Sequence, residues 1–157
     1  MPREREELDD LTTATWHPDN FTYGNSVQPE GSTTMRYLAL IYSDERADAA
    51  MTPDEQNANM AAWMSYSEDL GKSGKMLGGE ALQPTLTATT VRHGNGGNLI
   101  TDGPFAETKE QLGGYFVINA DNLDEAIAWV GKMPHLPRGG SVEIRPIMEF
   151  GTDGAAS

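Results

Sequence analysis

Residues 101–116 read TDGPFAETKEQLGGYF, an Asp-Gly-Pro-Phe turn followed by ionisable residues and by a Gly-Gly pair that opens an apolar strand. An aspartate in a turn usually accepts a hydrogen bond from the backbone N–H two residues later. For Asp102 that residue is Pro104, which has no N–H. We therefore expect a nonlocal donor for the Asp102 carboxylate, either Arg145 or a backbone N–H of the turn, with a solvated turn as the alternative. Gly103 permits the tight backbone that this turn needs.

Composition narrows the class of protein. The length of 157 residues suits one domain, and a hydrophobic content of 38% suffices for a modest core. The net charge of -13, without a basic stripe, argues against nucleic acid as a partner. No apolar run approaches the roughly 20 residues of a membrane span. The start MPREREELDD does not resemble a secretory signal, so we expect a cytoplasmic protein with no membrane partner. The lack of cysteine excludes disulfides, thiolate catalysis and cysteine-bound metals, and no cofactor motif is present.

Both ends of the chain differ from its middle. Residues 1–34 are rich in acidic residues and show no sustained apolar period, which predicts a mobile acidic arm. Three aromatic residues could instead anchor this arm on a groove: Trp16, Phe21 and Tyr23. Residues 151–157, GTDGAAS, have nothing to pack and are predicted to form a disordered tail. The folded domain is therefore expected over residues 35–150.

The first strand and the first helix of this domain have clear signals. Residues 36–42 form a nearly continuous apolar run, which is typical of a strand covered on both faces. Thr52 as cap, Pro53 in the first turn and Glu55 at the capping-box position predict a helix that ends within residues 71–74. Four apolar residues close to one face of this helix are predicted to lie in the core: Met60, Trp63, Met64 and Leu70.

The remaining apolar runs predict further strands, a hairpin loop at HGNGGN and a second helix. The strands are expected at residues 75–82, 85–93, 98–101, 115–120 and 142–148. The helix is expected to start at Asp121 or Asn122 and to run to Lys132, before Pro134. Its inward residues are predicted to be Ala126, Ile127, Trp129 and Val130.

This order of elements, with one extra hairpin, predicts a ferredoxin-like α+β fold with an antiparallel sheet and two main helices. Two helices cover only one face of such a sheet. Residues 37–42 and 115–118 are nevertheless apolar at both alternating positions. The second face therefore needs a cover, and we expect a homodimer that buries it against a second copy.

The motif DGPFAETKEQLGGY, with DEAIAW at residues 124–129 and EIRP at residues 143–146, closely resembles the signature of YCII-related proteins of the DGPF subgroup. The resemblance covers about residues 35–148 and implies a dimeric α/β barrel. It also implies an association with extracytoplasmic-function sigma factors. Other YCII-related proteins suggest an acid–base pair between a histidine on the first helix and an aspartate, but residues 58–70 contain no histidine.

Ionisable residues around the loop 93–112 are the candidates for chemistry. Asp102 and His93 are the candidate catalytic residues, because a carboxylate can orient an imidazole that titrates near neutral pH. A solvated hairpin histidine is the alternative. The candidate ligand-binding residues are Gly103, Pro104, Phe105, Glu107, Glu110 and Arg145.

The other charged and titratable residues give weaker signals. Arg145 is expected to pair with Asp102 or Glu107, and not directly with Glu143, which lies on the same strand. His135 lies between two prolines and is interpreted as a loop residue. No metal site is predicted, because the three histidines lack a ligand spacing.

Two functions follow from these features. The first is a small-molecule-binding accessory or regulatory dimer. The second is a small-molecule enzyme that uses Asp102 for proton transfer, with His93 or a neighbouring acid as its partner. The lack of a histidine on the first helix favours the first function.

Overall fold

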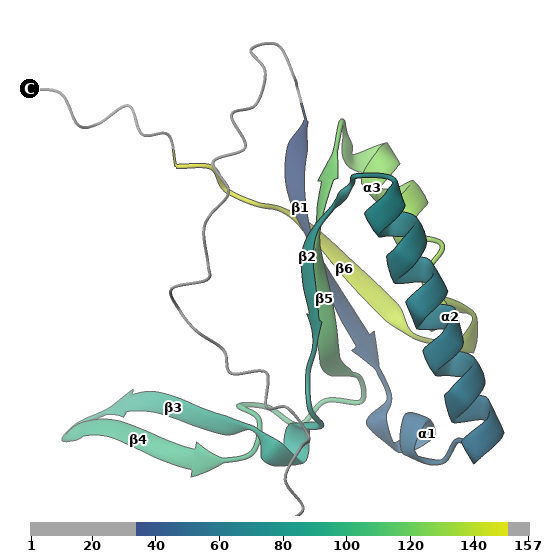
Figure 1. Cartoon of the computed structure of the whole chain (residues 1–157). Coiled ribbons are helices and arrows are strands. Elements are labelled where there is room, and N and C mark those ends of the chain that lie inside the picture. The colour runs from purple at the N-terminus through teal and green to yellow at the C-terminus, as the bar shows by residue number, and fades with distance from the viewer. Residues whose placement is uncertain (1–33, 151–157) are drawn as a thin grey trace, which may run out of the picture. The chain divides into compact units, whose positions relative to one another are not determined.

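The computed structural model describes residues 34–150, which form an α+β domain (Figure 1). Its strands are β1 (Met35–Ser43), β2 (Met76–Ala81), β3 (Thr89–Gly94), β4 (Gly97–Asp102), β5 (Gln111–Ala120) and β6 (Ser141–Pro146). Its helices are α1 (Glu45–Ala49), α2 (Pro53–Lys72) and α3 (Leu123–Val130), with single 3-10 turns at Thr85–Thr87 and Leu136–Arg138. The predicted tail, and all but residue 34 of the predicted acidic arm, lie outside the described residues.

Four strands form one antiparallel sheet in the order β2-β5-β1-β6. Helices α2 and α3 lie on the same face of this sheet (Figure 1). The arrangement is compatible with the predicted ferredoxin-like fold. The predicted extra hairpin is also present: β3 and β4 form a separate two-stranded sheet, which extends away from the main one (Figure 1).

Side-chain caps fix where the helices begin. The Thr52 hydroxyl accepts a hydrogen bond from the Glu55 N–H at 3.3 Å, and the Glu55 carboxylate accepts one from the Thr52 N–H at 2.7 Å, which confirms the predicted capping box. The hydrogen bonds from Thr52, chiefly that from its backbone, lower the pKa of the Glu55 carboxyl. Asn122 caps α3 as predicted. Asp44 caps α1, a short helix that the sequence analysis did not predict.

Helix α2 packs on the sheet mainly through its second half. Its buried residues are Tyr66 and Leu70, and none of its earlier residues is buried. Met60 and Met64 are 62% and 66% exposed, so the prediction that they lie in the core is wrong. Ile127 of α3 was also predicted to face inward and is exposed. Helical spacing identifies which residues share a face, but it does not say how much of that face a neighbouring element covers.

Tyr66 joins α2 to the sheet and to α3. Its ring meets Phe116 edge-on, with 5.6 Å between centroids, and meets Trp63 in the same way at 6.0 Å. Its hydroxyl donates a hydrogen bond to the backbone carbonyl of Trp129 at 3.3 Å. Burial raises the pKa of Tyr66 to about 12. The other buried members of this core cluster are Ala39, Leu70, Ile118, Val130 and Met133.

Glycines allow β2 and β5 to approach closely. A Cβ atom on Gly79 would lie 2.5 Å from Cδ1 of Phe116. A Cβ atom on Gly114 would lie 2.6 Å from the carbonyl oxygen of Glu80. Since interiors are close-packed, neither position has room for a larger residue without movement of its neighbours.

The face of the sheet opposite the helices is apolar at its centre. Leu38 pairs with Val117, and Leu40 pairs with Tyr115. Ala39, which lies between the two leucines, is buried on the helical side, and side chains alternate between the two faces of a strand. No helix of the described residues lies over this second face (Figure 1).

Replacing Gly114 with alanine should destabilise the sheet. Because the new Cβ would meet the Glu80 carbonyl oxygen at 2.6 Å, we expect the free energy of unfolding, measured with urea, to fall by about 1–3 kcal/mol. Gly78→Ala is the matched control, since a Cβ at Gly78 has no neighbouring atom within 4 Å. Equal stability of the two variants would contradict the close approach of the strands.

The Tyr66 hydroxyl gives a pH-dependent prediction. At neutral pH, Tyr66→Phe should lower the free energy of unfolding by about 0.5–1.5 kcal/mol, because the hydrogen bond to Trp129 is lost. The folded pKa of about 12 exceeds the ordinary value of 10.0, so the contribution of the neutral hydroxyl is complete below pH 10 and is lost as the pH rises through 12. The stability difference between wild type and variant should therefore shrink over this range. A constant difference would argue against the burial of the hydroxyl.

Candidate functional site

A groove of about 900 Å³ lies beside α1, between the middle of α2 and the sheet. Met60 and Trp63 line it on the helix side, and Ile41, Met76 and Phe116 line it on the sheet side. Because these lining side chains are apolar or aromatic, the walls of the groove are largely apolar, as is usual for a small-molecule site. None of the α2 residues that line it is buried, namely Asn59, Met60, Trp63 and Ser67.

His135 is a buried polar residue in the wall of this groove. It is only 3% exposed, and its ring lies against Trp63 with 5.3 Å between centroids. Its Nε2 lies 3.1 Å from the backbone carbonyl oxygen of Ser141. Since a carbonyl only accepts, we assign the proton of the neutral ring to Nε2 and the lone pair to Nδ1. Gly140 makes room for the ring, because a Cβ there would lie 2.1 Å from Cδ2 of His135.

Two acceptors on groove residues lack donors. Nδ1 of His135 and Oδ1 of Asn59 are buried, and neither has a hydrogen-bond partner among residues 34–150. Both residues line the groove. A buried acceptor without a donor costs free energy, and such groups commonly find a partner in a water molecule or a ligand.

Hydrogen-bonded acids surround the end of the groove near α1. Asp48 accepts hydrogen bonds from Ser43 at 2.6 Å and from the Arg138 guanidinium at 2.7 Å. Glu45 accepts from the backbone N–H and the hydroxyl of Thr85, at 2.8 and 2.7 Å. Arg46 also lines the groove and forms no ion pair within the described part of the chain.

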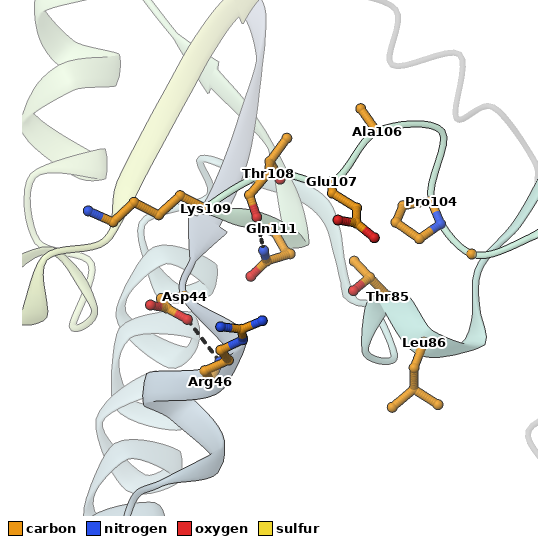
Figure 2. Close-up of a pocket in the computed structure, with 11 residues that line it drawn as sticks. Asp44, Arg46, Thr85, Leu86, Pro104, Ala106, Glu107, Thr108, Lys109 and Gln111 are labelled. Carbon is orange, nitrogen blue, oxygen red and sulfur yellow. Dashed lines mark hydrogen bonds between the residues drawn. The ribbon is translucent and has the colours of Figure 1, made fainter.

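A second cavity, of about 440 Å³, lies under the Asp-Gly-Pro-Phe turn (Figure 2). Three of the predicted ligand-binding residues line it: Gly103, Pro104 and Glu107. Gly103 has a φ of 92°, a conformation that glycine adopts without strain, and this accounts for the tight backbone expected at the turn. Arg46 and Leu86 line both this cavity and the groove, which makes the two spaces neighbours. In Figure 2 the Arg46 guanidinium points towards the middle of the cavity, whereas the Lys109 side chain points away from it.

The two candidate catalytic residues do not meet within the chain. Asp102 pairs with Thr89 at the base of the β3–β4 hairpin, and His93 pairs with Asn98 near its tip. Thr89 and His93 are four residues apart along β3, which corresponds to about 13 Å. Asp102 is exposed, and within residues 34–150 its carboxylate forms no hydrogen bond or ion pair. The expected nonlocal donor is therefore absent from this part of the chain.

Phe105 and Glu110 lie outside both cavities. The Phe105 ring is 76% exposed, and its backbone carbonyl accepts a hydrogen bond from Arg92 at 2.9 Å. The Glu110 carboxylate accepts a hydrogen bond from the hydroxyl of Ser141 at 2.7 Å. Glu110 therefore ties the loop before β5 to the start of β6.

The predicted partner of Arg145 is wrong. Its Nε contacts the Glu143 carboxylate, and it pairs with neither Asp102 nor Glu107. Both partners are exposed on β6, an edge strand, where two long side chains on one face can bend towards each other in water. Such an exposed ion pair contributes little to stability.

Residues 34–150 contain no group of three or more His, Asp or Glu side chains that could hold a metal ion. None of the described helices is both long and apolar enough to cross a membrane.

Sequence reasoning missed the polar residues that line the groove. It gave no role to Arg46 or Asn59, and it treated His135 as a loop residue. The segment SDERADA directly after the first strand contained one usable signal, because Asp44 is a good helix cap and Arg46 follows it in the first turn. The burial of His135 had no signal, since it depends on the nonlocal contact with Trp63.

Comparison with known proteins gives a family but no activity. The profile of the YCII-related domain matches residues 35–151. An uncharacterized protein of Rhizobium meliloti (strain 1021) is 37% identical over 114 residues, which cover 72% of this chain and 92% of that protein. The match includes every described strand and helix. The chain therefore belongs to the family of proteins with a YCII-related domain.

Proposed function

We propose that this protein binds a small organic molecule in the groove between α2 and the sheet. The observation that carries the proposal is the combination of an apolar groove of about 900 Å³ with two buried acceptors that lack donors, on Asn59 and His135. Apolar walls supply affinity, and a few fixed polar atoms orient the ligand. The neighbouring cavity under the Asp-Gly-Pro-Phe turn, with Gly103, Pro104 and Glu107, is a second part of the same proposed site.

The proposed functional unit is a homodimer. The apolar centre of the second sheet face, around Leu38 and Val117, supports this assembly because its residues have no helical cover in the described domain. A second copy of the same face is self-complementary, as a two-fold interface requires. The dimeric α/β barrel that the family resemblance implies has the same geometry.

A regulatory role is the part of the proposal that rests on resemblance. The DGPF motif at residues 102–105 favours the DGPF subgroup and, with it, an accessory role beside extracytoplasmic-function sigma factors in the cytoplasm. We do not extend the proposal to catalysis, because His93 and Asp102 lie at opposite ends of the β3–β4 hairpin. An enzyme that uses Asp102 would need a catalytic partner other than His93, such as a neighbouring acid.

Ligand binding can be tested with a pair of methionine variants on α2. Met60 lines the groove and Met64 does not, although both are exposed on the same helix. A metabolite-extract screen read by mass spectrometry should recover a ligand with the wild type and with Met64→Lys. Met60→Lys, which places a charge at the apolar wall, should weaken binding of that ligand about tenfold or more. Failure to recover any ligand, or equal weakening of ligand binding by both substitutions, would contradict the proposal that the groove is the binding site.

The dimer can be tested by light scattering after size-exclusion chromatography. At micromolar concentration we expect twice the chain mass of 17.0 kDa. Leu38→Asp should give a monomer, because a charge at the centre of the second face cannot be buried without a partner. Ile127→Asp is the control, since Ile127 is an exposed apolar residue on α3, on the other side of the sheet. A wild-type monomer would contradict this assembly.

A further inference from the structure

The groove presents an unpaired cation at one end. Arg138 and Arg46 are the basic residues that line it, and Arg138 is already paired with Asp48 at 2.7 Å. Arg46 forms no ion pair within residues 34–150, and Figure 2 shows its guanidinium directed into the space beneath the turn. A guanidinium offers several N–H donors in one plane, which suits a carboxylate or another planar anion.

The acids nearest to Arg46 in the sequence already accept hydrogen bonds from other groups. Asp44 accepts from backbone N–H groups at the start of α1, at 2.9 and 3.4 Å. Glu45 accepts two hydrogen bonds from Thr85, at 2.8 and 2.7 Å. These carboxylates are held by their own donors, and Glu107, which lines the neighbouring cavity with Arg46, forms no ion pair with it, so the Arg46 guanidinium stays available to a ligand.

The middle of the groove sets two further requirements. Trp63 and Phe116 supply flat aromatic surface, and Met60 is a flexible side chain that adapts to a ring. Asn59 Oδ1 and His135 Nδ1 are acceptors that neighbouring side chains cover, so a ligand reaches them only when those side chains move, and it must then bring an O–H or N–H donor. A ligand that lacks a donor would leave these acceptors unsatisfied.

We propose that the ligand is a small aromatic anion with a hydroxyl or N–H donor. Its carboxylate-like group pairs with Arg46, its ring packs against Trp63 and Met60, and its donor satisfies His135 or Asn59. The inference rests on the proposed function and specifies the chemical class of its ligand. It concerns binding, and it requires no reaction.

The test is calorimetric titration of the full chain with three matched probes. 4-Hydroxybenzoate carries both features, benzoate lacks the donor, and 4-hydroxybenzamide lacks the charge. We expect 4-hydroxybenzoate to bind about tenfold or more tightly than either of the other probes. Equal affinity for the amide, or no binding of 4-hydroxybenzoate at millimolar concentration, would overturn the inference.

Two variants test which basic residue binds the anionic group of the ligand. Arg46→Gln should weaken the binding of 4-hydroxybenzoate about tenfold and leave 4-hydroxybenzamide unchanged. Lys72→Gln makes the same change in net charge at an exposed residue of α2 that lines neither cavity, and it should have no effect. If both variants weaken binding equally, Arg46 does not hold the anion. If the metabolite screen recovers a neutral groove ligand, this inference fails while the proposed function stands; if it recovers no ligand, both fail.

Discussion

The packing of Tyr66 holds α2 against the sheet and against α3. Its ring lies edge-on to Phe116 of the sheet and to Trp63, and its hydroxyl donates to a carbonyl of α3. These contacts anchor α2 by its second half, while no residue of α2 before Tyr66 is buried. The groove lies along the middle of α2, where Asn59, Met60, Trp63 and Ser67 line it. The helix that these contacts hold on the sheet therefore also forms one wall of the larger of the two cavities.

The groove leaves several hydrogen-bonding and charged groups without partners. Burying acceptors such as His135 Nδ1 and Asn59 Oδ1 without donors costs free energy. Other polar groups nearby, such as Asp48 and Glu45, do have hydrogen-bond donors. Among residues 34–150 three buried acceptors lack donors, on Asn59, Asn119 and His135. Two of these residues, Asn59 and His135, line the groove together with Arg46. Several unpaired groups in one cavity point to a ligand site more strongly than a single unpaired group does, because one ligand can bind to all of them. The family match adds no activity that would compete with this account.

Local chemistry predicted much of the fold, and nonlocal contacts account for the failures. The capping box at Thr52 and Glu55 could be predicted from the sequence because its residues are close together in the chain. The exposure of Met60 and Met64 could not be predicted, because the spacing of apolar residues says nothing about how far a helix lies from a sheet. His93 and Asp102 lie near each other in sequence, yet the hairpin register separates them. Arg145 pairs with Glu143 because both are exposed on an edge strand, which the apolar pattern could not reveal.

The most direct measurement is a methyl NMR spectrum of methionine-labelled protein during titration with 4-hydroxybenzoate. Met60 and Met76 line the groove, whereas Met64 and Met148 are exposed elsewhere. A ligand in the groove places its ring beside the first pair, so their methyl resonances should shift with a common dissociation constant, while those of the second pair stay in place. Shifts confined to Met64 or Met148, or no shifts at saturating ligand, would contradict the account.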